Sequence, residues 1–165
     1  MARCRRGSAG VDAGLSAILR GVESRVFTLE AVNALVPRLE AKVGKQLERR
    51  AEIEQLLARL GREMGDVPER IVLDPADPTE LRDLKRSLVR HIEEYRAGWR
   101  EVEAMGAVLK DPRIGLLDFL GEVDGKRVWL CWKHGETECG FYHGLEEGFS
   151  ARKAIGHSVR TRLLN

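Results

Sequence analysis

Residues 126–152 read KRVWLCWKHGETECGFYHGLEEGFSAR. This stretch holds two of the three Trp, two of the three Cys and two of the four His residues of the chain. RVWLCW and CGFYH are rich in β-branched and aromatic residues, and a turn at 134–137 separates them, so they predict two antiparallel strands. Asp124-Gly125, just before this stretch, predicts a further hairpin turn.

Two more short apolar runs precede that turn. AVLK ends at Asp111-Pro112, and GLLDF follows. Together the four runs predict a small antiparallel sheet of three to four strands over residues 107–143. A sheet of this size needs another element to cover one of its faces.

The segments before the sheet show helical periodicity. Thr28 is a good N-cap with Glu30 in the first turn, and apolar residues at three- and four-residue spacing predict a helix over 28–60, bent by Pro37 near Asn33. Asp77 as N-cap and Pro78 at the first helical position predict a second helix over 78–105. The predicted fold class is α+β: a long antiparallel helical hairpin (28–105) packed on the sheet.

The charge distribution divides the chain into three parts. Residues 1–25 carry five Arg and two acidic residues, and residues 150–165 carry four basic residues and no acid. The net charge is +2, so the part between them is net negative. We expect a flexible basic extension (1–25), a single α+β domain (26–155) and a basic tail (156–165). A domain that reads duplex nucleic acid has a basic structured face, so only weak contact through the tails is expected.

Three widely spaced cysteines indicate free thiols in a reducing compartment. Asp12 and Arg20 interrupt any signal-peptide core, and no run approaches the ~18 apolar residues that span a membrane. The sequence therefore predicts a cytoplasmic protein without membrane contact, and it gives no indication of a cofactor.

The chain contains, in order, the motifs FTLEA (27–31), NALVP (33–37), LKDP (109–112), GLLDF (115–119), LCW (130–132), GE (135–136), YH (142–143) and GF (148–149) with Arg152. Together these motifs resemble the prokaryotic family called domain of unknown function 2203 (DUF2203). The resemblance covers about residues 26–155. It implies a long helical hairpin with a small sheet, and it implies no activity. Tyr142 and Lys153-Ala154 depart from the family pattern, in which Trp and Gln-Pro are more frequent.

Zinc binding is the first of three alternative functions. Cys131, His134, Cys139 and His143 have the spacing C-x2-H-x4-C-x3-H, and zinc accepts this ligand set. If 134–137 is a four-residue loop, Trp132 pairs with Cys139, and His143 then faces away from Cys131. The four side chains would not converge, so we expect no metal at these residues.

An enzyme is the second alternative. His143 with Asp118 or Glu136 would form an acid–base pair, because a carboxylate orients an imidazole and fixes its tautomer. Cys131 would be the nucleophile of a thiol enzyme. The same strand geometry separates Cys131 from His143, and a cysteine between Leu130 and Trp132 is typically an inert core residue.

The third reading, a non-enzymatic binding module, is the one we adopt. Helices of this length leave apolar surface that so small a sheet cannot cover, which predicts a homodimer or small homo-oligomer. Near the sheet, polar and aromatic side chains would bind an unidentified protein or a small anionic ligand held by Arg152. Val128, Leu130, Trp132 and Phe141 are expected to seal the sheet onto the helices, and Asn33 to serve the backbone at the helix bend. The candidate ligand-binding residues are Arg152, His143, Glu136, Asp118, Trp129 and Tyr142.

Overall fold

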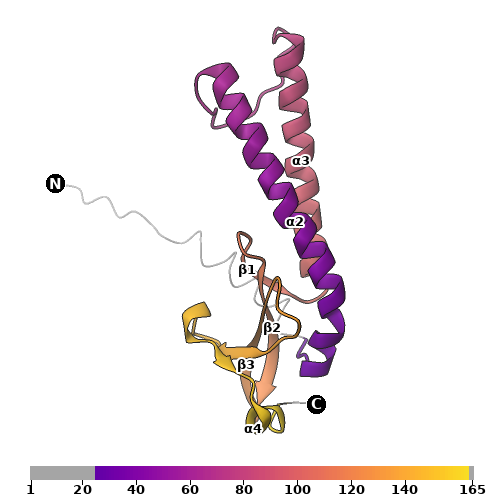
Figure 1. The fold of residues 1–165 in the computed structure, drawn as a ribbon, viewed down its shortest axis with the longest axis vertical. Helices are drawn as coiled ribbons and strands as arrows, with labels where there is room; N and C mark the ends of the chain where they lie inside the picture. The colour runs from indigo at the N-terminus through magenta and orange to yellow at the C-terminus, as the bar shows by residue number, and fades with distance from the viewer. Residues whose placement is uncertain (1–24, 164–165) are drawn as a thin grey trace, which may run out of the picture.

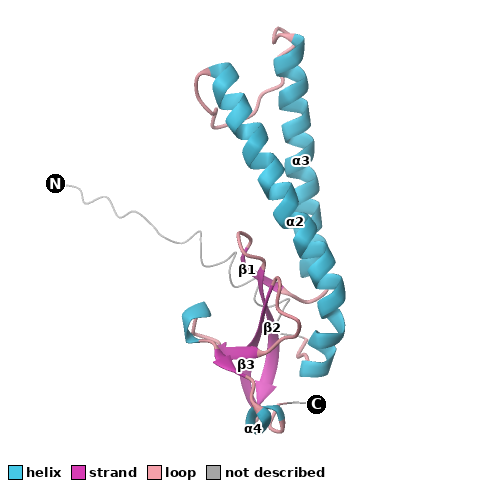
Figure 2. Cartoon of the chain, in the orientation of Figure 1, coloured by secondary structure: helices cyan, strands magenta, loops and turns pink. Residues whose placement is uncertain are grey.

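The computed structural model describes residues 25–163, which form a helical hairpin followed by an antiparallel sheet (Figure 1, Figure 2). The predicted α+β class is therefore confirmed. The sheet has five strands rather than three to four, and its order is β1-β2-β3-β4-β5. The elements are α2 (Leu29–Met64), α3 (Thr79–Glu103), β1 (Val108–Asp111), β2 (Leu116–Val123), β3 (Lys126–Lys133), β4 (Phe141–Gly144), the 3-10 helix η1 (Phe149–Ala151), β5 (Lys153–Ala154) and α4 (His157–Arg160).

Helix α2 begins as the sequence predicts and ends later. The Thr28 side chain accepts a hydrogen bond from the Ala31 amide (3.1 Å), which satisfies one of the free N–H groups of the first turn. Gly61 does not end the helix. The chain instead leaves the helix at Gly65, whose left-handed conformation (φ 82°) suits a glycine cap.

The predicted N-cap of α3 is wrong. Pro78 occupies the N-cap position and makes no side-chain cap bond. The Asp77 carboxylate instead accepts a hydrogen bond from Lys85 Nζ at 2.7 Å, and both of these side chains are largely buried. This ion pair holds the connection between the helices against the start of α3, so Asp77 still contributes to the helix start.

The hairpin has two halves with different neighbours. The half that contains the start of α2 and the end of α3 lies against the sheet, and the other half extends past it (Figure 1). In the half against the sheet, Val32, Leu39 and Val102 are fully buried in the main core. In the other half, which we call the distal half, Leu60, Leu84 and Leu88 form a separate apolar cluster between the helices. The sheet therefore supports only one half of the hairpin.

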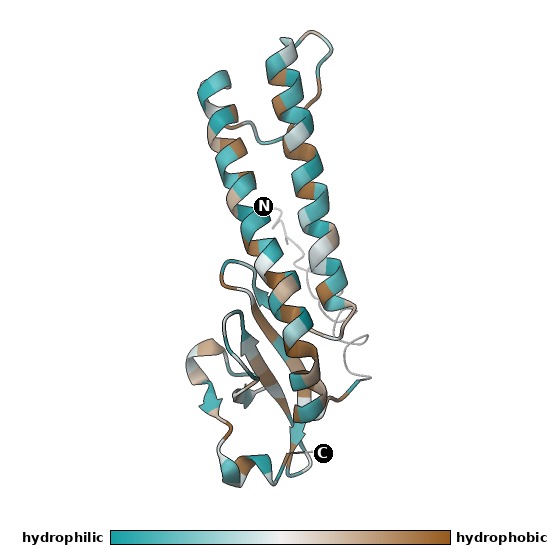
Figure 3. Cartoon of the chain, turned by 45° about the vertical axis from the view of Figure 1, so that its right-hand side comes forward, coloured by the Kyte–Doolittle hydropathy of each residue, from teal (hydrophilic) through white to brown (hydrophobic). Residues whose placement is uncertain are grey.

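The main core lies between the sheet and the helices. Leu117, Phe119, Leu130 and Trp132 project from β2 and β3 into it and are fully buried. Figure 3 shows these hydrophobic strands beside the helices, whose outer surfaces are mostly hydrophilic. Phe27 packs edge-to-face on Phe119, with ring centroids 5.3 Å apart.

The last described residues lie against the sheet. Val159 of α4 and Leu163 are buried in the main core, and Leu163 forms a β-bridge with Val123. Arg162 pairs with Asp124 at 3.0 Å. Most of the predicted N-terminal extension, residues 1–24, lies outside the described residues. Among the described residues, the helices lack an apolar stretch sufficient to span a bilayer.

Candidate functional site

The register between β3 and β4 decides which side chains meet. Cys131 pairs with Phe141, and Trp129 pairs with His143. Residues paired across two antiparallel strands share a face, as do residues two apart, so Cys131 and His143 lie on the same side of the sheet. The prediction that they face apart, and that Trp132 pairs with Cys139, is wrong by one residue.

The cause of this shift is a contact with α2. The backbone N–H of Cys139 donates a 2.7 Å hydrogen bond to Asn33 Oδ1 on the helix rather than to β3. Trp132 Nε1 donates to the carbonyl oxygen of Glu136 (2.9 Å) within the same loop. The whole segment 134–140 is therefore a loop, longer than the four-residue turn that the sequence suggested. Asn33 supports this loop through its amide oxygen.

Three polar side chains meet on the sheet face that points away from the helices. Asp118 of β2 pairs directly with Cys131 of β3, and His143 lies beside them on β4. Their ligand atoms all lie within 4.8 Å of one another, and each residue is at most 1% exposed. We call these three residues the Asp-Cys-His cluster. Each of the three belongs to one of the motifs on which the resemblance to DUF2203 rests.

Both nitrogens of the His143 ring face acceptors. Nδ1 lies 2.9 Å from the carbonyl oxygen of Gly144, which can only accept, so Nδ1 carries a proton. Nε2 lies 3.1 Å from Asp118 Oδ2. The second carboxylate oxygen, Asp118 Oδ1, is buried and has no hydrogen-bond partner among the described residues. A buried polar atom in this state is destabilising unless something else binds it.

Two cationic side chains border the cluster. Lys110 Nζ lies 3.5 Å from Asp118 Oδ2 and 5.1 Å from the centre of the Trp129 ring. Arg152 pairs with Glu136 at 3.0 Å and places a guanidinium nitrogen 3.8 Å from Cys131 Sγ. Lys110 was not among the predicted site residues, because nothing in the pattern of the first strand distinguishes it from a solvent-exposed lysine.

Aromatic rings hold Arg152 in place. Its guanidinium lies 4.3 Å from the centre of the Phe141 ring and 4.2 Å from that of Phe149. These contacts, with the Glu136 ion pair, engage the group that was expected to hold an anion. They also correct the role of Phe141, which packs on Arg152 and not against the helices as predicted.

The two described cysteines are weak acids. Burial, together with the neighbouring Asp118 carboxylate, raises the pKa of Cys131 far above its ordinary value, against the lowering effect of Arg152. Burial raises the pKa of Cys139 to about 12. Neither thiol has the thiolate character that a nucleophile needs at neutral pH.

The remaining candidate residues lie elsewhere. Tyr142 packs against the main core on the helix side of the sheet, and Trp129 is buried beside the cluster. Cys139 is buried in the main core, and His134 Nε2 lies 3.2 Å from Glu40 on α2. The four residues with the zinc-like spacing, which were predicted from the sequence to stay apart, therefore do not all converge. Only Cys131 and His143 come together, and the third side chain beside them is Asp118 rather than Cys139 or His134.

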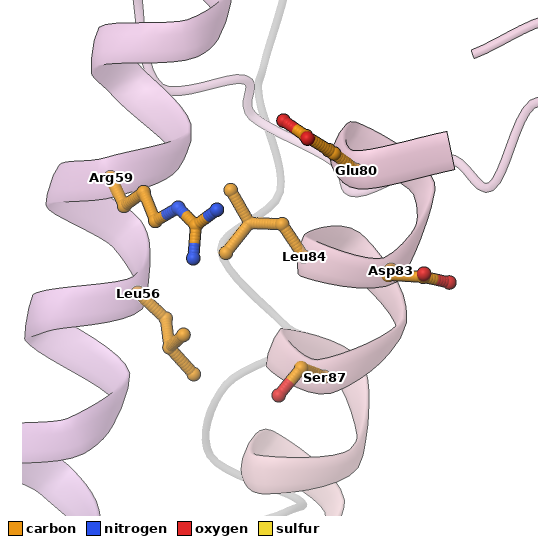
Figure 4. A pocket seen from close by; sticks show the side chains of 6 residues that line it. All are labelled: Leu56, Arg59, Glu80, Asp83, Leu84 and Ser87. Atoms are coloured by element: carbon orange, nitrogen blue, oxygen red, sulfur yellow. The ribbon is translucent and has the colours of Figure 1, made fainter. Parts of the chain in front are cut away.

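A groove lies between the helices in the distal half of the hairpin (Figure 4). It has a volume of about 400 Å³. In Figure 4, Leu56 and Arg59 extend from α2 toward α3, and Leu84 extends from α3 toward α2. The groove is lined by Leu56, Arg59, Glu80, Asp83, Leu84 and Ser87.

Comparison with known proteins gives a family and nothing finer. A family model described as "Uncharacterized conserved protein (DUF2203)" matches residues 25–155, which include both helices and the sheet. No match was found among curated proteins or among solved structures. The family description assigns no activity, so function has to be argued from the geometry.

Proposed function

The chain belongs to the DUF2203 family of uncharacterised conserved proteins, and we propose that it is a non-enzymatic binding module that self-associates through the distal half of its hairpin. The observation that carries this proposal is the groove between α2 and α3. Its floor is apolar, and its two sides carry opposite charges. The occupant we propose is the same groove of a second copy.

The distal half lacks the cover that the sheet gives to the other half. A helix of 36 residues is about 54 Å long, whereas the strands of the sheet have at most 8 residues. Leu56, Leu57 and Ile53 pack against the distal cluster and are only partly buried. A second hairpin packed on this surface would complete their burial, as in a four-helix bundle.

The charges on the groove favour a symmetric partner. Arg59 on α2 and Glu80 on α3 are both exposed, and neither forms an ion pair with another described residue. In a two-fold dimer, residue i of one copy contacts residue j of the other, and the reverse contact forms at the same time. Two copies can therefore pair Arg59 with Glu80 twice, which favours self-association over a partner of one charge sign.

Apolar side chains at the end of the hairpin extend this surface. Met64, Val67, Val72 and Leu73 lie in or next to the connection between α2 and α3 and are between 43% and 63% exposed. Large apolar side chains that are exposed close together are typical of interaction surfaces. They lie beyond the distal cluster and add to the apolar area that association would bury.

The Asp-Cys-His cluster does not support a catalytic proposal. A substrate would have to reach atoms of side chains that are at most 1% exposed, beneath Lys110 and Arg152. A thiol kept protonated by burial is a poor nucleophile. The cluster therefore does not favour an enzyme, and the groove favours a binding module.

We also propose a reducing, cytoplasmic location. Cys131 and Cys139 are free, and they lie on opposite sides of the sheet. Free buried thiols are typical of proteins from reducing compartments.

Light scattering coupled to size-exclusion chromatography, over a series of protein concentrations, tests self-association. We expect the wild-type chain to have the mass of two copies. Leu56→Asp places a charge on the floor of the groove and should shift the protein to one copy. Ala58→Asp introduces the same charge at an exposed position outside the groove and should leave the mass unchanged. Circular dichroism verifies that both variants stay helical.

A wild-type chain that remains a monomer at every concentration would contradict the proposal. So would a dimer that Leu56→Asp leaves intact, because a carboxylate buried at the contact is strongly unfavourable.

A further inference from the structure

We propose that the Asp-Cys-His cluster is a binding site for a divalent transition-metal ion of the zinc class, with Asp118, Cys131 and His143 as ligands. The proposal is independent of the self-association described above. It rests on the placement of the three ligand atoms, on the hydrogen bond of His143 and on the unpartnered oxygen of Asp118.

The spacing of the ligand atoms fits a common ion. Two ligands that are each about 2 Å from a tetrahedral zinc ion lie about 3.3 Å apart, and Asp118 Oδ2 and His143 Nε2 are 3.1 Å apart. The ligand atoms of the three residues, Cys131 Sγ among them, lie within 4.8 Å of one another, a limit that includes the about 3.6 Å expected between a sulfur ligand and a nitrogen or oxygen ligand of zinc. A small shift of the thiol toward the other two atoms would close the site.

The orientation of His143 suits a metal ligand. A histidine that binds a metal through one nitrogen usually donates its other N–H to a carbonyl or carboxylate, which fixes the tautomer. The contact of Nδ1 with the Gly144 carbonyl (2.9 Å) does this and leaves Nε2 as the ligand atom. The ring is 1% exposed, so strand β4 and its surroundings hold it in this orientation.

The unpartnered oxygen of Asp118 points independently to a ligand. Oδ1 is buried without a hydrogen-bond partner among the described residues, although Asp118 itself is 1% exposed. A cation bound through Oδ1, or through both oxygens of this carboxylate, would compensate the desolvation of Oδ1. Lys110 at 3.5 Å satisfies only the other oxygen, Oδ2.

The donor set selects the metal. A thiolate, an imidazole and a carboxylate together suit zinc or a similar transition ion, whereas calcium and magnesium prefer oxygen donors alone. Metal binding would displace the thiol proton, so two anionic ligands would face the divalent ion. Glu136 neutralises the nearby Arg152, which leaves Lys110 as the cation against the cluster among residues 25–163.

Metal content and the cobalt spectrum of the full chain test the site. We expect one zinc ion per chain after purification from zinc-supplemented cells, measured by inductively coupled plasma mass spectrometry. Replacement by Co²⁺ should give a thiolate-to-cobalt charge-transfer band. This band arises only with a sulfur ligand, so the wild-type chain alone can reveal one. Cys131→Ser should abolish this band, and His143→Gln should lower the metal content.

Matched variants separate ligation from general damage to the fold. Within residues 126–152, Cys139→Ser removes the other cysteine, which is also buried, and His134→Gln removes the other histidine. Both should retain one metal ion and the cobalt band. A folded wild-type chain that takes up no zinc or cobalt would overturn the proposal, as would a band that persists in Cys131→Ser or disappears in Cys139→Ser.

Discussion

Cys139 is a residue whose ionisation opposes folding. Its thiol is fully buried in the main core, and burial raises the pKa of Cys139 to about 12. In the unfolded chain a cysteine ionises near pH 8.5. Between these two values the unfolded state holds fewer protons than the folded state, so rising pH destabilises the fold.

The free energy of unfolding should therefore fall between pH 8.5 and 12, with up to about 1.4 kcal/mol per pH unit arising from this thiol. Cys139→Ala should have a shallower alkaline decline, whatever its stability at pH 7. Urea unfolding at several pH values between 7 and 10.5 measures both slopes. Equal slopes in the wild type and the variant would show that the buried thiol does not contribute.

The same residue explains why the site could not be predicted from sequence. The alternation of β3 was predicted correctly, and Leu130 and Trp132 do face the helices. The position of β4 was not, because the Cys139 amide bonds to Asn33, 106 residues earlier in the chain. A shift of one residue moves every side chain of a strand to the other face. Because of this one-residue difference in register, His143 lies on the same face of the sheet as Cys131.

At the scale of elements, the crossing of α2 and α3 depends on Gly98. A β-carbon at Gly98 would overlap the end of the Gln46 side chain. Gln46 is 2% exposed, and its amide can bond to the Tyr95 carbonyl (3.1 Å) and to Arg49 (3.0 Å). It cannot move aside without losing both bonds. Glycine is therefore favoured here even though alanine is the better helix former.

Two effects of opposite sign meet in the Gly98→Ala variant. Helix propensity alone would stabilise it by about 1 kcal/mol, whereas overpacking typically costs about 1–3 kcal/mol. Because Gln46 is held on both sides, we expect a net loss of stability in chemical denaturation. In a Gln46→Ala background the clash is absent, and Gly98→Ala should then be stabilising. If the substitution has the same effect in both backgrounds, the close contact does not control this crossing.

Helix ends were predicted with mixed success for a local reason. Thr28 caps α2 through a bond to an amide three residues on, so sequence alone located that end. The residue that ends a helix depends on where the backbone can turn. Gly61 stays helical and Gly65 adopts the left-handed conformation. The local sequence does not indicate which of the two glycines ends the helix.

At the scale of the whole molecule, hydrophobic periodicity was enough to predict a helical hairpin beside a small sheet. It did not reveal the fifth strand, because β5 has only two residues and is held by pairing with β4. Nor did it reveal the burial of Val159 and Leu163 against the sheet. The contact of Leu163 with Val123 joins segments that are distant in sequence, and a local pattern cannot encode it.

The central claim is that two copies associate through the distal half of the hairpin, and mixing two charge-reversed variants tests it most directly. Arg59→Glu leaves only acidic charges on the two sides of the groove, and Glu80→Arg places an arginine on each side, with Asp83 still present on α3. Both positions are exposed, so neither change should disturb the core. In a two-fold dimer each variant alone places like charges opposite one another, whereas a mixed dimer restores two opposite-charge contacts.

Analytical ultracentrifugation of each variant and of the equimolar mixture, at low salt, gives the measurement. We predict that each variant alone sediments as a monomer, or dimerises more weakly than the wild type, and that the mixture sediments as a dimer. Added salt should weaken the mixed dimer, since the contact is at the surface. The contrary result is a mixture that sediments as the sum of its components. In that case the distal groove is not where two copies meet.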